Sequence, residues 1–245
     1  MENYTPATSF GADTAADYDD LSQRGDEAAT VALLEQLAGG GPALELAIGT
    51  GRIALPLAAR GIRVDGIDFS PEMVARLRAK PGGAQIAVTI GNYADVAVPG
   101  SYRLIYIVFN TLFNLLTQDE QVRCFENVAA HLSDDGLFVV EGGVPAEFYN
   151  LRNNQYVDAE AITGDSLRLD VARFDPVTQL LEETHVTLSG AGIRLSPIVT
   201  RYAWPAELDL MARIAGLRLR ERWGGWGREP FTARSGNCVS VYGRL

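Results

Sequence analysis

The sequence predicts an α/β protein with a doubly wound, seven-stranded and mostly parallel sheet that an antiparallel strand closes. Short apolar segments, such as 44–48 and 104–108, alternate with helical patterns in the way that βαβ units require. A glycine-rich turn, Gly49-Thr50-Gly51, joins the first segment to a helix that is expected to begin near Arg52. With 245 residues the chain is long enough to bury one large core.

The other core elements follow in chain order. Strands are expected over 63–67, 86–90, 137–140, 217–223 and 238–242, and the last two form the antiparallel end of the sheet. Ser70 and Thr117 have the residue types and positions of helix N-caps, and Thr117 with Glu120 forms a capping box. Pro205 is expected to begin the last helix, which Gly216 ends.

Three regions are predicted from these patterns. Residues 1–41 form an N-terminal helical cap with helices over 13–24 and 27–37. Residues 42–143 and 205–245 form the nucleotide-binding core. Between them, the hydrophobic period changes from 3.6 to 2, so residues 144–204 are expected to form an inserted antiparallel β region.

The glycine-rich turn indicates a ligand that contains adenosine. Such a turn brings backbone N–H groups and the positive end of a helix close to a bound molecule. The second strand ends at Asp68, and the distance from Gly51 to Asp68 in the sequence is close to the roughly 20 residues that bring a ribose-binding carboxylate to the second strand of a nucleotide fold.

In these motifs the chain resembles the class I S-adenosylmethionine (SAM)-dependent methyltransferases, small-molecule and natural-product type. Their first motif runs acidic-x-Gly-x-Gly-Thr-Gly and their second strand ends Gly-x-Asp-x-Ser-x-x-Met. The matching residues are Glu45, Gly49, Thr50, Gly51, Gly66, Asp68, Ser70 and Met73. Ala47 departs from the pattern because it stands where the family usually has its first glycine.

The resemblance implies a SAM site, with S-adenosylhomocysteine as the product. The turn takes the methionine moiety, Asp68 takes both ribose hydroxyls, and Asn92 and Tyr93 lie at the adenine. Asn92 is equally suited to an Asx turn. A methionine at the spacing of Met73 is more commonly a core residue, but the surrounding motif favours contact with the adenine. The residues expected at the cofactor are Tyr18, Glu45, Ala47, Gly49, Thr50, Gly51, Asp68, Phe69, Met73, Asn92, Tyr93 and Phe109.

Four residues are candidates for the methyl-transfer site. Asn110 follows the fourth strand, where an open α/β sheet binds ligands. Glu141, at the end of the fifth strand, is either an acceptor-facing carboxylate or a salt-bridged strand end. His185, in the insert, is either a solvated residue or an acceptor-site base. Tyr18, in the cap, is either a ligand contact or an amphipathic anchor.

The expected chemistry is an in-line SN2 transfer of the methyl group to a nitrogen or oxygen atom of a small-molecule acceptor. A sulfonium methyl is already electrophilic, so positioning does most of the work and can contribute roughly 7–11 kcal/mol. The insert is expected to cover the acceptor or to form a homodimer contact.

Composition excludes several classes of partner. The formal net charge of -10 argues against nucleic acid and against an anionic membrane surface. The two cysteines, Cys124 and Cys238, form neither a metal-ligand spacing nor a disulfide framework, so no metal is expected. No export signal and no membrane span is recognised, and we expect a cytoplasmic protein.

Two alternatives remain open at this point. A nicotinamide (NAD(P))-dependent oxidoreductase is disfavoured because the third glycine of Gly-x-Gly-x-x-Gly and a Tyr-x-x-x-Lys pair are missing. A non-catalytic protein that only binds SAM stays possible, since no base is evident and fold does not fix function.

Overall fold

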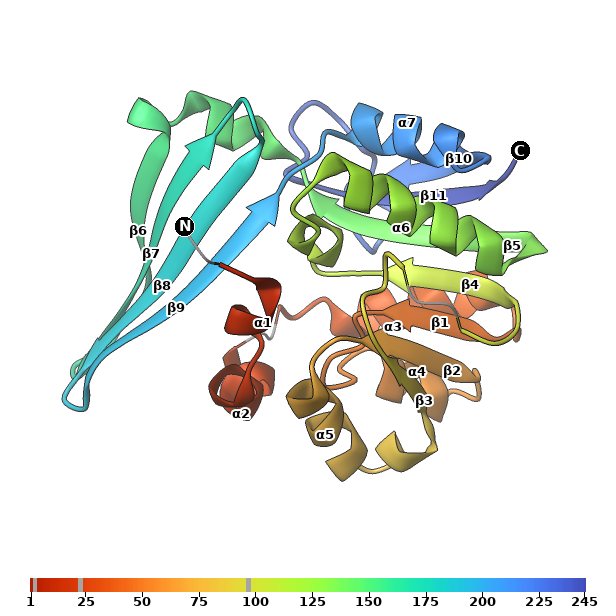
Figure 1. The fold of residues 1–245 in the computed structure, drawn as a ribbon, viewed down its shortest axis with the longest axis horizontal. Helices are drawn as coiled ribbons and strands as arrows, with labels where there is room; N and C mark the ends of the chain where they lie inside the picture. The colour runs from red at the N-terminus through yellow and green to blue at the C-terminus, as the bar shows by residue number, and fades with distance from the viewer. Residues whose placement is uncertain (2–3, 22–23, 96–97) are drawn as a thin grey trace.

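The computed structural model describes residues 1, 4–21, 24–95 and 98–245, and Figure 1 shows two separate sheets. The larger sheet has seven strands in the order β10-β11-β5-β4-β1-β2-β3, and β1 to β5 run parallel. Strand β11 runs antiparallel to both of its neighbours, which confirms the predicted fold class. The bounds are β1 Ala43–Leu46, β2 Val64–Asp68, β3 Ala87–Ile90, β4 Tyr102–Ile107, β5 Leu132–Gly143, β10 Leu217–Trp223 and β11 Asn237–Arg244.

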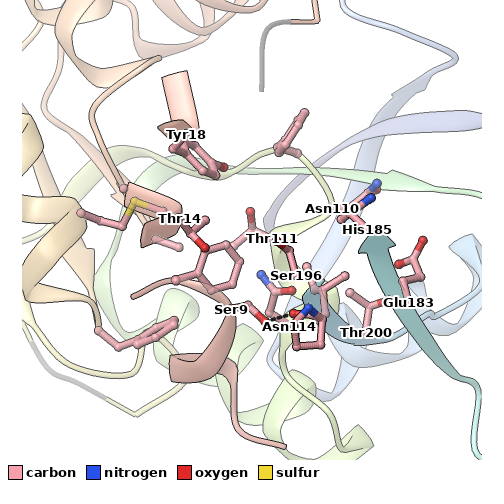
Figure 2. A pocket seen from close by; sticks show the side chains of 18 of the residues that line it. Ser9, Thr14, Tyr18, Asn110, Thr111, Asn114, Glu183, His185, Ser196 and Thr200 are labelled. Carbon is pink, nitrogen blue, oxygen red and sulfur yellow. Dashed lines mark hydrogen bonds between the residues drawn. The ribbon is translucent and has the colours of Figure 1, made fainter. Parts of the chain in front are cut away.

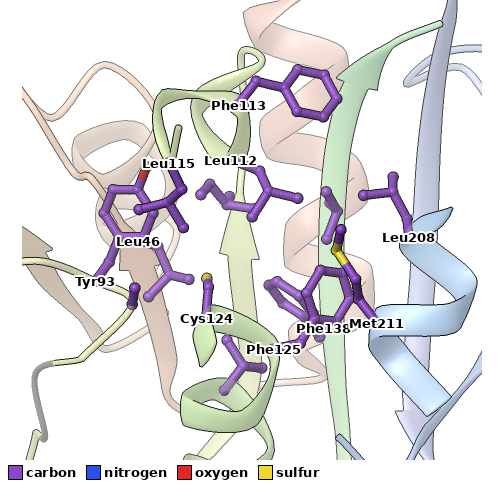
Figure 3. Close-up of a cluster of buried hydrophobic side chains, with 14 of the residues drawn as sticks. Leu46, Tyr93, Leu112, Phe113, Leu115, Cys124, Phe125, Phe138, Leu208 and Met211 are labelled. Atoms are coloured by element: carbon purple, nitrogen blue, oxygen red, sulfur yellow. The ribbon is translucent and has the colours of Figure 1, made fainter. Parts of the chain in front are cut away.

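Helices cover both faces of this sheet. Helices α6 and α7 pack over one face and α3 and α4 over the other, each with its own buried cluster. Figure 3 shows the first cluster, in which Phe125 from α6 and Met211 from α7 meet Phe138 from β5. The bounds are α3 Glu27–Ala38, α4 Ala54–Ala59, α5 Pro71–Ala79, α6 Gln118–His131 and α7 Pro205–Ile214, with short 3₁₀ turns at Gly83–Gln85, Thr111–Asn114, Pro145–Asn150 and Arg152–Asn154.

The helix starts follow from their capping residues. The Ser70 hydroxyl accepts a hydrogen bond from the backbone N–H of Met73, and Pro71 follows it in the first turn of α5. At α6, Thr117 and Glu120 form the predicted capping box in both directions. The helix expected from Arg52 begins two residues later, at Ala54, because turns occupy residues 52 and 53.

The insert is a four-stranded antiparallel sheet in the order β6-β7-β8-β9. It stands to one side of the core in Figure 1. The register places Asp170 of β7 opposite His185 of β8, which lies opposite Ser196 of β9. Alternate residues therefore share one face of this sheet. The bounds are β6 Gln155–Ile162, β7 Ser166–Asp175, β8 Leu180–Ser189 and β9 Gly192–Arg201.

Two short helices, α1 (Pro6–Ser9) and α2 (Ala12–Leu21), lie between the insert and α5 (Figure 1). Contacts on both sides hold them there. The Ser9 hydroxyl donates to the carbonyl of Pro197 in β9, at 2.7 Å, and the Thr50 hydroxyl donates to Asp19 Oδ1, at 2.5 Å. The helix predicted over 13–24 corresponds to α2, which ends at Leu21. Residues 22 and 23 of the predicted range lie outside the described part of the chain.

Cys124 in α6 and Cys238 in β11 are both buried and free. Within the described residues, no helix is long and apolar enough to cross a membrane.

Candidate functional site

Every second residue of the turn after β1 has left-handed backbone. The φ angles are 55° at Ala47, 56° at Gly49 and 79° at Gly51. Glycine tolerates this region freely, whereas an alanine there is strained because its Cβ approaches the backbone. The conformation explains why the related motif has glycine at the position of Ala47. At Gly51 a Cβ would also lie only 3.0 Å from Leu55 and Leu77, so the turn packs tightly on α5.

Asp68 holds this turn in place from the end of β2. Its Oδ2 accepts from the backbone N–H of Gly49 at 2.7 Å, and its Oδ1 accepts from the backbone N–H of Ser70 at 2.8 Å. Burial raises the pKa of the Asp68 carboxyl, and those hydrogen bonds oppose the shift. Each carboxylate oxygen offers two lone pairs, so Asp68 retains acceptor capacity for a ligand.

A second buried carboxylate, Glu45, lies under the same turn. It is 3% exposed, and its Oε2 accepts from the hydroxyl of Tyr106 at 3.0 Å. Burial raises the pKa of Glu45 to about 8. A small cavity here is lined by Glu45, the turn and Arg52, so its wall includes both an acidic and a basic side chain.

The loop after β4 is strained at two adjacent residues. Phe109 and Asn110 have φ angles of 63° and 61°, which is the left-handed region that side chains disfavour. Asn110 Oδ1 accepts from the backbone N–H of Gly143 at 2.6 Å, and the guanidinium groups of Arg24 and Arg52 lie 5.1 and 4.6 Å from the Phe109 ring centre. These contacts hold the strained loop in place at the carboxyl end of β4.

Glu141 helps to hold the loop after β4, and its carboxylate is not free. Its Oε2 accepts from the backbone N–H of Phe109 at 2.7 Å, and its Oε1 accepts from Arg24 Nη1 at 2.5 Å. Of the two interpretations left open by the sequence, the geometry is that of a salt-bridged strand end.

The principal cavity lies between the turn, the cap and the insert, and its volume is about 320 Å³. Figure 2 shows Tyr18 and Thr14 of the cap on one side, with Glu183, His185 and Thr200 of the insert facing them. The predicted residues that line it are Tyr18, Ala47, Gly49, Asp68, Phe69, Met73, Tyr93, Phe109, Asn110 and His185.

Asn92 lies outside this lining. It is exposed, and its Oδ1 accepts from the backbone N–H of Ala94 at 2.9 Å, which is the Asx-turn geometry. Tyr93 is buried, lines the cavity and donates its hydroxyl proton to the carbonyl of Thr111 at 2.7 Å.

Three charged residues at the site were missed by the sequence interpretation: Arg24, Arg52 and Glu183. Arg52 directly follows the glycine-rich turn, and Glu183 lies two residues before His185, on the same face of β8. The alternation of polar residues could have identified Glu183. No local signal identifies Arg24, because its partner Glu141 is 117 residues away.

Comparison with known proteins shows which family of proteins this chain is similar to. A family model described as a methyltransferase domain matches residues 43–136. The solved CcbJ methyltransferase from Streptomyces caelestis is 37% identical, with 97% of this chain and 98% of that chain covered and a TM-score of 0.91. The cypemycin N-terminal methyltransferase of Streptomyces sp is 28% identical over 208 residues, 82% of each protein. SAM-bound CalS10, an amino pentose methyltransferase from Micromonospora echinaspora, shares the fold with a TM-score of 0.71, 20% identity and 94% and 95% coverage.

Proposed function

This chain belongs to the class I SAM-dependent methyltransferases, and from that premise we propose that it methylates a nitrogen or oxygen atom of a small molecule held in the principal cavity. The observation that carries the proposal is that one cavity is lined both by the SAM motif, through Asp68 and Gly49, and by polar residues of the insert. A ligand there lies between a cofactor site and a separate acceptor surface.

The residues present fit SAM. Asp68 keeps lone pairs for ribose hydroxyls, and Phe69, Met73 and Tyr93 offer apolar surface for an adenine ring. The smaller cavity suits the amino-acid end of the cofactor. There Arg52, which pairs with Glu27 at 2.8 Å, retains further guanidinium N–H donors for a carboxylate, and the Glu45 carboxyl group retains an oxygen that can accept from an ammonium group.

Bound SAM supplies a methyl group on a sulfonium, which needs no covalent activation by the protein. The remaining task of the protein is to exclude water and to orient the acceptor, which can contribute roughly 7–11 kcal/mol. Tyr18 and Phe109 line both cavities, and aromatic faces favour a neighbouring cation. We name no general base.

Nitrogen is the favoured acceptor atom. The descriptions of the cypemycin N-terminal methyltransferase and of the amino pentose methyltransferase CalS10 both point to a nitrogen-bearing target, and CalS10 is described as involved in calicheamicin biosynthesis. We therefore propose a role in natural-product biosynthesis, in the cytoplasm.

Calorimetric titration with S-adenosylhomocysteine, NAD and NADP tests the cofactor assignment. We expect micromolar binding of S-adenosylhomocysteine alone. Binding of a nicotinamide cofactor instead would overturn the assignment. Methyl transfer from labelled SAM to members of an amine and alcohol library then distinguishes an enzyme from a protein that only holds SAM.

We also retain the homodimer as a proposal. The insert exposes Val157 on β6 and Ile193 and Leu195 on β9 by 67%, 72% and 62%, and exposed large apolar side chains on the edge strands of a sheet favour an interaction surface. Light scattering is expected to give twice the chain mass for the wild type and the single mass for Leu195→Asp. A wild-type monomer would refute the proposal.

A further inference from the structure

The inner face of the insert carries a cluster of charged side chains that the cofactor does not need. Asp170 on β7 lies opposite His185 on β8, and Glu183 is two residues from His185 on the same face. Glu160 on β6 lies 3.1 Å from His185, through its Oε1 and the histidine Nδ1. We call Glu160, Asp170, Glu183 and His185 the insert cluster; Glu183 and His185 line the principal cavity directly (Figure 2).

Polar atoms on this face are shielded from water without a hydrogen-bond partner. Within the described part of the chain, two buried side-chain oxygens on this face, Asp170 Oδ1 and Thr200 Oγ1, have no partner. Arg168 Nε and His185 Nδ1 also lack a well-directed hydrogen bond, but both lie in ion-pair contact with Glu160. Thr200 is only 5% exposed and faces the cavity in Figure 2. Buried polar atoms without partners are costly, so their concentration at one cavity wall indicates a ligand that completes them.

The cluster has more acceptors than donors. The hydroxyl of Tyr156 lies 2.7 Å from Asp170 Oδ2 and 3.1 Å from Glu183 Oε1, but it carries one proton and can donate to only one of them. The nearby cations are already engaged, since Arg168 contacts Glu160 at 2.5 Å and Arg194 contacts Asp17 at 2.9 Å. The cavity wall therefore combines surplus negative charge with unsatisfied acceptors.

We propose that the insert cluster binds a protonated amine of the acceptor, and this inference rests on the proposed methyltransferase function. An ammonium group has three hydrogen-bond donors and one positive charge. It can therefore donate to Asp170, Glu183 and Thr200 and neutralise negative charge on the two carboxylates. The ammonium group anchors the acceptor molecule at the cavity wall that faces Tyr18 and Thr14. Because an ammonium nitrogen has no lone pair, a different atom of the acceptor is methylated. The acceptors are thus small molecules that carry a basic amine in addition to the methylated nitrogen or oxygen.

The charge of this site depends on pH. Burial and the neighbouring Asp170 raise the pKa of Glu183 to about 7, so Glu183 becomes neutral as the pH falls below that value. Amine binding is therefore expected to weaken between pH 8 and pH 6. The titratable and charged groups that face Glu183 are Tyr156 and Glu160 on β6, Arg168 and Asp170 on β7, His185 on β8 and Tyr202 after β9.

Saturation-transfer NMR on the S-adenosylhomocysteine-saturated protein tests the proposal. The probes are amine and alcohol pairs with a common skeleton: glucosamine with glucose, cyclohexylamine with cyclohexanol, and tyramine with 2-(4-hydroxyphenyl)ethanol. We expect at least one amine to bind about tenfold more tightly than its alcohol at pH 8. Glu183→Gln, alone and with Asp170→Asn, should remove most of this preference and its pH dependence.

The matched control is Glu182→Gln, because Glu182 is adjacent on β8 but alternates to the other face of the strand. It should leave the preference unchanged. Equal binding of amines and alcohols to the wild type, or an unchanged preference in both Glu183 variants, would overturn the inference. S-adenosylhomocysteine affinity, measured in every variant, distinguishes this result from a failure of the proposed function and reports that the variants fold.

Discussion

The core turn and the inner face of the insert differ in how far the protein itself satisfies their polar groups. In the core, Asp68 and Glu141 already accept hydrogen bonds from backbone N–H groups, and strained residues such as Phe109 are held by surrounding contacts. On the insert, Asp170 Oδ1 and Thr200 Oγ1 have no partner within the described residues. Under the proposed function, the core supplies a preorganised cofactor site, and the insert supplies an acceptor surface whose polar groups are satisfied only by the ligand.

The largest predicted difference between the two regions is the pH dependence of stability. The native pKa of Glu45 is about 8 against an ordinary 4.5, so the native state binds more protons than the unfolded state across that interval. The contribution of Glu45 to the free energy of unfolding therefore falls as pH rises from 4.5 to 8, by at most about 1.4 kcal/mol for each pH unit. Glu45→Gln keeps an acceptor for Tyr106 and removes this loss.

Glu183→Gln is the matching change on the insert. The native pKa of Glu183 is about 7, so its contribution to stability changes over a narrower pH interval, from 4.5 to 7. The Glu183→Gln substitution should therefore change the pH dependence of the free energy of unfolding by less than Glu45→Gln does. Urea unfolding at pH 5.5, 7 and 8.5 measures both. Parallel pH profiles for the wild type and Glu45→Gln would contradict the prediction.

The next effect is on the cofactor. Asp68→Ala removes the acceptor for two backbone N–H groups and for the ribose, so affinity for S-adenosylhomocysteine should fall at least about tenfold, or roughly 1.4 kcal/mol. Isothermal titration calorimetry measures this affinity. Asp170→Asn, in the insert, is the control and should leave this affinity within about twofold. Unchanged affinity in folded Asp68→Ala would remove Asp68 from the site.

The smallest effect is expected at Ala47. Ala47→Gly relieves the left-handed strain at φ 55° and should raise the free energy of unfolding by about 1 kcal/mol. The same change at Ala43, in the regular strand β1, should lower it, because glycine gains entropy in the unfolded chain without relief of strain. Thermal or urea unfolding of both variants checks the signs, and a loss of stability at Ala47 would show that its conformation carries no strain.

The same contrast explains how much the sequence predicted. The SAM motif lies in two continuous segments, so its residues and the strand-turn-helix around them could be identified directly, and Asp68 was expected beside the turn. The role of Glu141 could not be resolved because its partner Arg24 is distant in the sequence. The insert cluster depends on the register of β6, β7 and β8, which pairing in three dimensions fixes and periodicity alone does not.

The contacts of α1 and α2 have a kinetic consequence. Asp19 ties the cap to Thr50 and Lys80 of the core, whereas Ser9 and Arg194 tie it to the insert. Tyr18 of this cap lines both cavities, so we expect the cap to move when a nucleotide-sized molecule enters or leaves. We therefore expect a compulsory order, in which SAM enters first and S-adenosylhomocysteine leaves last. Product inhibition that is competitive with SAM and noncompetitive with the acceptor is the signature of this order, and a random-order pattern would show that the cap is no barrier.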